Sequence, residues 1–301
     1  MSNLPLCATT AAAGVCSAIF LFAGVLCILN GKQTDFKLYI IMGVSSLLRG
    51  TGYAVCAGTI LRGSSNVGEA VIYSFFLNAG FGMCVAVASL LLGVWFKNAS
   101  MKSKPPQPHH WRMLCILFFP VAIISGPVLG IVQVVEIYGV GGLNQFSTAK
   151  MLRMASVTAL LADTSVSALI EISMFLMQLT SVRRERWATN SDKMVGIMAI
   201  ASLLLLWSAA FRVRSTYVDP SLMVNERLYY PLQVLPELLQ IMLWAVPGLM
   251  HRAGLGNGYE AWYELTHGVP PAGGSHSQDA VTTDSDMEAG KGDVKIVAIS
   301  K

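Results

Sequence analysis

Charged and hydrogen-bonding side chains recur at helical spacing inside long apolar stretches of this chain. One such row contains Asp163, Ser167, Glu171, Met174 and Gln178, at steps of three or four residues. At 3.6 residues per turn, these side chains share one face of a helix. A charged group at mid-bilayer costs roughly 2.5–3.5 kcal/mol on the insertion scale, so such a face must point into the protein or into water.

Four more rows follow the same spacing in other apolar stretches. They are Tyr229, Gln233, Glu237, Gln240 and Trp244; Ser45, Arg49, Gly52 and Cys56; Ser208, Arg212 and Ser215; and Gln133 with Glu136. Arg49 and Glu237 both fall near the centre of their stretches. We therefore expect Arg49 to pair with Glu237 or with Asp163.

The buried acids outnumber the buried arginines. The acids are Glu136, Asp163, Glu171 and Glu237, and the deep arginines are Arg49 and Arg212. At least one carboxyl is expected to lack a cation, which favours its neutral form and suits a proton relay or the recognition of an amine. The alternative is that the polar groups only hold helices together, by hydrogen bonds worth roughly 0.6 kcal/mol each.

The elements that position these residues are membrane-spanning helices. A helix needs about 20 apolar residues to cross the hydrocarbon core, and the chain is 54% hydrophobic and 13% charged. Seven stretches qualify, at about 5–30, 37–61, 69–96, 112–139, 152–180, 194–217 and 228–250. Because backbone groups in lipid must be satisfied internally, we predict an all-α fold, a polytopic bundle of seven transmembrane helices.

The charges between the helices predict the orientation. Loops one, three and five carry ten Lys or Arg residues, against five in loops two, four and six. Basic loops stay in the cytosol, so the N-terminus is expected outside and the C-terminus in the cytosol. Residues 1–252 form the transmembrane domain, and the acidic, Gly- and Pro-containing residues 253–301 a mostly disordered cytosolic tail. The sequon at Asn98 falls in cytosolic loop three and is expected to be unused.

Other sequence features argue against several functions. The six cysteines lie in or next to spans without metal-ligand spacing, so we expect small buried residues and no disulfide framework. Helices six and seven contain no Lys for a retinal Schiff base, and no phosphate-binding loop or nucleophile elbow is present. We expect no catalytic residue, no cofactor and no metal. The net charge of +4 is too small to indicate nucleic-acid binding.

The last stretch of the bundle resembles a known family. Phe211-Arg212-Val213 is followed by Asn225-Glu226-Arg227-Leu228-Tyr229-Tyr230 and Leu235-Pro236-Glu237. This pattern is similar to the fungal lipid-translocating exporters, seven-helix proteins linked to aminocholesterol resistance. Glu226, Tyr230, Leu235 and Pro236 match the family motif, whereas Gln233 and Glu237 replace its Asp and Met, and Arg49 stands where the family has Glu. A weaker resemblance, over 37–53 and 90–99, is to the plant tobamovirus multiplication proteins.

The polar rows and this resemblance predict a protein that moves, or confers resistance to, lipids or amphiphilic small molecules as part of a stress response. We expect the polar cavity to be lined by Arg49, Asp163, Glu171, Arg212, Glu226, Tyr230, Gln233 and Glu237. The expected location is the plasma membrane, with an endomembrane as the alternative. The alternative function is a receptor-like or scaffolding seven-helix protein that recruits cytosolic partners through its basic loops and acidic tail.

Overall fold

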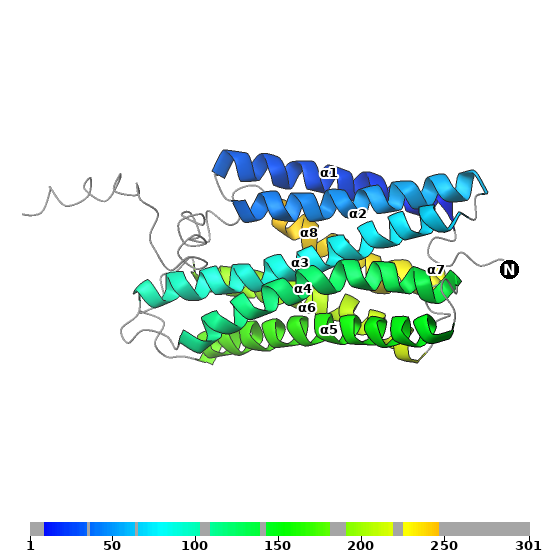
Figure 1. Ribbon diagram of the computed structural model, residues 1–301. Helices are drawn as coiled ribbons and strands as arrows, with labels where there is room; N and C mark the ends of the chain where they lie inside the picture. The colour runs from blue at the N-terminus through cyan, green and yellow to red at the C-terminus, as the bar shows by residue number, and fades with distance from the viewer. Residues whose placement is uncertain are drawn as a thin grey trace, which may run out of the picture.

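The protein is an all-α bundle throughout the part of the chain that the structure describes (Figure 1). The computed structural model describes residues 9–34, 37–63, 66–102, 109–138, 143–180, 191–218 and 225–246. Its helices are α1 (Thr10–Thr34), α2 (Lys37–Leu61), α3 (Val67–Lys102), α4 (His109–Tyr138), α5 (Leu143–Thr180), α6 (Ser191–Tyr217), α7 (Glu226–Tyr229), the π-helical segment η2 (Tyr230–Val234) and α8 (Leu235–Ala245). The predicted tail, residues 253–301, lies outside the described residues.

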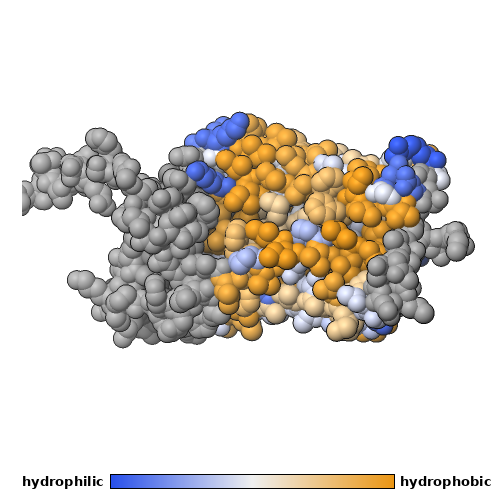
Figure 2. All heavy atoms as spheres, in the orientation of Figure 1, coloured by the Kyte–Doolittle hydropathy of each residue, from blue (hydrophilic) through white to orange (hydrophobic). Residues whose placement is uncertain are grey.

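The long helices have the length and composition of membrane spans. Six of the described helices, α1 to α6, are long and apolar enough to cross a bilayer. The seventh segment runs through α7, η2 and α8 without leaving the helical state. On the face drawn in Figure 2, apolar residues cover most of the middle of the bundle and strongly polar residues lie toward its two ends. The predicted all-α architecture and an integral membrane protein are therefore confirmed.

Several helix ends differ from the expected ones. α5 begins at Leu143 rather than near residue 152, so Lys150 and Arg153 are helical residues and not part of loop four. The segment before residue 152 contains neither Gly nor Pro, so the helix continues although its sequence becomes polar. α3 likewise runs on beyond its expected end near residue 96, to Lys102.

α3 lies at the centre of the bundle. It packs against α2, α4, α5 and α6, and 83% of its most apolar window is buried, the largest share among the six spans. The ring of helices closes where α8 packs against α1, α2 and α6. There the amide of Asn30 on α1 donates a hydrogen bond to the Ala245 carbonyl, at 2.9 Å. A polar group on α3 can therefore reach partners on four other helices.

Close backbone contact between α3 and α4 depends on glycine. A Cβ atom placed on Gly82 would lie 2.5 Å from the carbonyl oxygen of Ala122, closer than real Cβ atoms come, and 3.0 Å from the Cα atom of Gly126. Small residues at helix interfaces allow this approach in membranes, where van der Waals packing drives helix association. The contact between Gly82 and Gly126 sets the distance, and thereby the relative position, of the two helices.

The seventh segment contains a local change of helix type. η2 has Pro231 in its first turn, and α8 has Pro236 in its first turn. The Leu235 amide donates to the Tyr230 carbonyl, a π-type hydrogen bond over five residues. A proline has no amide hydrogen and its ring crowds the carbonyl four residues before it, so the wider π turn accommodates the ring. The π turn ends at Val234, three residues before Glu237.

Candidate functional site

Glu237 binds two arginines that come from two different helices. Nη2 of Arg212, on α6, lies 3.0 Å from Oε1 of Glu237. Nη2 of Arg49, on α2, forms an ion pair with Oε2 of the same carboxylate. Of the two partners expected for Arg49, the structure selects Glu237 and not Asp163. All three charged side chains are at most 4% exposed, so their charges are compensated by protein groups rather than by water.

Two neutral side chains complete what we call the arginine cluster, defined as Arg49, Arg212, Glu237, Asn78 and Ser208. Ser208 lies one turn before Arg212 on α6 and donates its hydroxyl hydrogen to the Glu237 carboxylate. Nη1 of Arg212 donates to the side-chain oxygen of Asn78 on α3. The cluster therefore connects α2, α3, α6 and α8 at the middle of the bundle.

Aromatic rings cover both arginines. The guanidinium carbon of Arg212 lies 4.1 Å from the centre of the Phe81 ring, and that of Arg49 lies 5.0 Å from the centre of the Phe20 ring. The ring of Phe20 also stacks on Tyr53, with centroids 5.7 Å apart. The cluster has two cations and one carboxylate, and the negative faces of the rings offset part of the excess positive charge.

A second polar group lies between α3, α5 and α6. Ser89 on α3 donates to Oδ1 of Asp163 at 2.7 Å, and the hydroxyls of Ser89 and Ser167 are 3.4 Å apart. Glu171, two turns beyond Asp163, accepts a hydrogen bond from Ser202 on α6. We call these residues the acid–hydroxyl chain. Among the ion pairs of the described residues, none involves Asp163 or Glu171.

The two polar groups occupy different depths. Asn78, which binds Arg212, and Ser89, which binds Asp163, are both on α3. Eleven residues separate them, and at 1.5 Å per residue this corresponds to roughly 16 Å along the helix. The predicted site residues therefore form two groups rather than one cavity lining. Arg49, Arg212 and Glu237 come together, whereas Asp163 and Glu171 belong to the other group.

The remaining predicted residues have less direct roles. Gln233 lies in η2 and is buried. The ring of Tyr230, also in η2, packs edge-on against Tyr229, with centroids 5.4 Å apart. Glu226 is the first residue of α7, and its side chain lies outside the described part of the chain.

Sequence reasoning missed several of the partners. It counted Arg153 among the five basic residues of loops two, four and six, whereas the structure buries this residue in α5 and pairs its Nη1 with Oε2 of Glu136 at 2.8 Å. It also overlooked Asn78, Ser89 and Ser202. A usable signal existed for Asn78 and Ser89, because eleven residues are close to three full helical turns and place both on one face of α3.

The cysteines bear on two expectations, that the chain has no disulfide framework and that it has no metal site. Cys56, near the end of α2, is disulfide-bonded, so the expectation of no disulfide is wrong for this residue. Cys16, Cys27 and Cys84 are free. Within the described ranges, no group of three or more His, Cys, Asp or Glu residues is arranged to hold a metal ion.

Comparisons with protein families, with curated proteins and with solved structures find no match for this chain. The resemblance to the lipid-translocating exporters therefore stays a prediction. What the site can do follows from its own groups: buried charges that hold helices together, and carboxyls that have hydroxyl partners but no cation.

Proposed function

We propose that this integral membrane protein moves lipids or other amphiphilic small molecules across the bilayer and so protects the cell from toxic amphiphiles. The observation that carries the proposal is the position of Glu237. Its carboxylate is bound by arginines of two other helices, and it lies just after the π turn of its own helix. Interrupted helices next to buried charges are a recurrent feature of transporter binding sites.

In this proposal the arginine cluster is a contact that breaks and re-forms during transport. If Glu237 exchanged Arg49 or Arg212 for a cationic or hydrogen-bonding headgroup, the seventh segment would lose a link to α2 or α6. The π turn supplies a flexible place in that segment, since its hydrogen bonds are already displaced from the α-helical pattern. An amphiphile fits this arrangement because its headgroup would meet the polar interior while its tail stays in lipid.

The test is a flux measurement on the purified chain reconstituted in liposomes that contain fluorescent sphingoid bases or fluorescent phospholipids. Wild type should speed the movement of at least one probe between leaflets. Glu237→Gln should reduce the rate at least tenfold, because a neutral amide cannot hold two arginines. The matched control is Arg62→Gln, which removes a cation that is 64% exposed at the end of the bundle and should leave the rate unchanged.

Two results would overturn the proposal: no probe moves faster with wild type than with empty liposomes, or Glu237→Gln works as well as wild type. A receptor-like or scaffolding protein would behave differently in cells. Deletion of residues 264–301 should abolish the function of a scaffold that depends on its tail, whereas a transporter should keep its flux after this deletion.

A further inference from the structure

The acid–hydroxyl chain shares no residue with the arginine cluster, and its two acids are deeply buried. Asp163 is 0% exposed and Glu171 is 2% exposed. One oxygen of each carboxyl, Oδ2 of Asp163 and Oε2 of Glu171, has no hydrogen-bond partner. Each acid thus has one oxygen that is hydrogen-bonded to a serine and one oxygen that is free to form a further hydrogen bond.

Among the described side chains of the neighbouring helices, no cation compensates these acids. On α6, Arg212 is engaged by Glu237 and Asn78, and Arg214 points outward. On the α4 side, Glu136 is already paired with Arg153. α3 contributes hydroxyls but, between Asn78 and Trp95, no charged residue. A carboxylate without a counter-ion in such surroundings is far less favourable than a neutral carboxylic acid.

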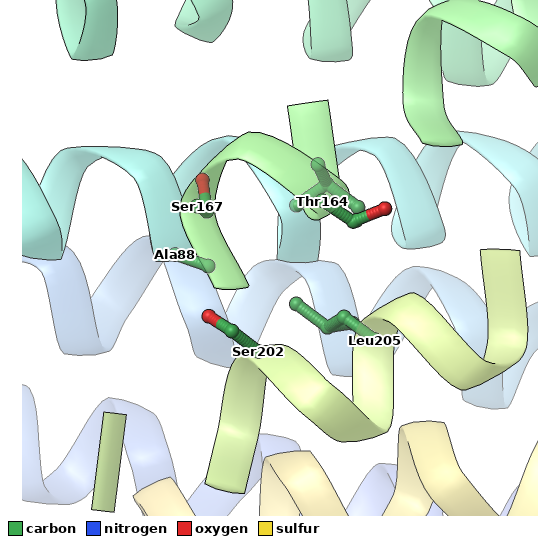
Figure 3. Close-up of a pocket in the computed structure, with 6 residues that line it drawn as sticks. Ala88, Thr164, Ser167, Ser202 and Leu205 are labelled. Atoms are coloured by element: carbon green, nitrogen blue, oxygen red, sulfur yellow. The ribbon is translucent and has the colours of Figure 1, made fainter. Parts of the chain in front are cut away.

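A small gap separates the two halves of the chain. It is lined by Thr164, Ser167, Ser202 and three apolar side chains of α3 and α6. Figure 3 shows Ser167 of α5 and Ser202 of α6 on opposite sides of this space. Ser167 belongs to the half that contains Asp163, and Ser202 to the half that contains Glu171.

The size of the gap limits which ligand the acids could bind. The gap has no room for a water molecule. A metal cation needs several oxygen ligands around it, at about 2.0–2.6 Å for Mg²⁺ and Ca²⁺, and the gap has no room for that shell. A proton needs no such space, because it resides on a carboxyl oxygen and moves between oxygens that already form hydrogen bonds.

We propose that Asp163 and Glu171 are proton-carrying groups of this protein, and that the gap between Ser167 and Ser202 is the point at which their path is interrupted. In the resting protein both acids carry a proton. After Asp163 has lost its proton and α5 and α6 have closed the gap, the Ser89 hydroxyl gives its proton to Oδ1 of Asp163, the oxygen to which it already donates. Ser89 takes a replacement proton from Ser167, Ser167 takes one from Ser202, and Ser202 takes one from Glu171. Each serine ends as a neutral hydroxyl, Asp163 becomes the neutral acid and Glu171 becomes the carboxylate, so one proton has moved and no bond between heavy atoms has changed. The inference rests on the proposed function in one respect only, namely that the movement of the proton drives transport.

The protonation can be tested without any transport. The full chain is placed in lipid nanodiscs, and the carbonyl stretch of protonated carboxylic acids is followed by infrared difference spectroscopy over a pH titration in H₂O and D₂O. Wild type should show buried, protonated acids at neutral pH. Asp163→Asn and Glu171→Gln should each remove one band. The matched control, Glu136→Gln, removes an acid that is paired with Arg153 and should remove none.

The proposal is overturned if neither variant changes the protonated-acid region, or if Glu136→Gln removes the same bands. Should an acid variant fail to fold, Ser202→Ala provides an independent check. It deletes the hydroxyl that binds Glu171 and should shift the Glu171 band to higher frequency. An unshifted spectrum in Ser202→Ala would contradict the assignment.

A second measurement separates this inference from the proposed function. In the liposome assay, an imposed pH gradient should change the wild-type flux several-fold, and Glu171→Gln should abolish this response. A flux that does not change with the pH gradient would contradict the proton coupling but not the proposed function. No flux, together with intact carboxylic-acid bands, would contradict the proposed function but not the proton-carrying role of the two acids.

Discussion

At the scale of single residues, the balance of charge in the arginine cluster decides what each side chain contributes. Glu237 compensates both Arg49 and Arg212, so it is the only carboxylate in the cluster. Removing one partner of a buried ion pair costs about 3–5 kcal/mol, because the other charge is left uncompensated in a medium of low polarity. Loss of Glu237 leaves two arginines without a counter-ion, whereas loss of one arginine leaves the other arginine paired with Glu237.

We therefore expect Glu237→Gln to destabilise the protein more than Arg212→Gln does. The second change leaves Arg49 and Glu237 as a neutral pair. The double variant Arg49→Gln with Glu237→Gln should recover part of the stability lost in Glu237→Gln, since it removes one of the stranded cations. Thermal unfolding of the purified variants in one lipid environment measures all of them. Equal losses for Glu237→Gln and Arg212→Gln would contradict a shared carboxylate.

At the scale of helices, the glycine contact between α3 and α4 places the residues that α3 presents to the interior. Asn78 and Ser89 reach partners on α6 and α5, and both depend on where α3 lies. Gly82 is located between them in the sequence and faces the backbone of α4. A change in the spacing of α3 and α4 would therefore move both polar groups.

Gly82→Ala and Gly14→Ala should have effects of opposite sign. Alanine is the better helix former by about 1 kcal/mol in a helix interior, so Gly14→Ala, where an added Cβ meets nothing within 4 Å, should raise or keep the melting temperature. At Gly82 the Cβ would press on the backbone of α4, and overpacking of this kind costs about 1–3 kcal/mol. Thermal melts compare the two. A stabilised Gly82→Ala would show that α3 and α4 are not in close contact.

At the scale of the whole molecule, the distribution of basic residues and one disulfide agree on an orientation. The basic residues are concentrated in loops one, three and five. Cys56 is disulfide-bonded. It lies near the C-terminal end of α2, which leads into loop two, whereas the N-terminal end of α2 follows loop one. Disulfides persist in oxidising compartments. Both features favour loop two on the outer or lumenal side.

An outside N-terminus and a cytosolic C-terminus have direct experimental consequences. A tag at the C-terminus should become accessible to protease only after intact cells are permeabilised. With this predicted orientation, Asn98→Gln should leave the gel mobility unchanged, since an asparagine on the cytosolic side would not meet the glycosylation machinery. A tag labelled from outside, or a glycan on Asn98, would invert the orientation.

The sequence by itself determined the all-α class, the order of the helices and the buried side of those helices that carry a row of polar residues. This worked because hydrophobic length and helical period are local properties. The row Tyr229, Gln233, Glu237, Gln240 and Trp244 is buried throughout, although a π turn interrupts the helix.

Only the tertiary structure decided which charges meet. Arg49 had two acceptable partners, and its choice of Glu237 depends on how α2 and α8 are rotated and shifted against each other. The pairing of Arg153 with Glu136 depends on how α4 and α5 are rotated against each other. Asp163 and Glu171 have hydroxyl partners and, among the described residues, no cation for the same reason: depth and rotation in the bundle result from contacts between helices, which no local pattern encodes.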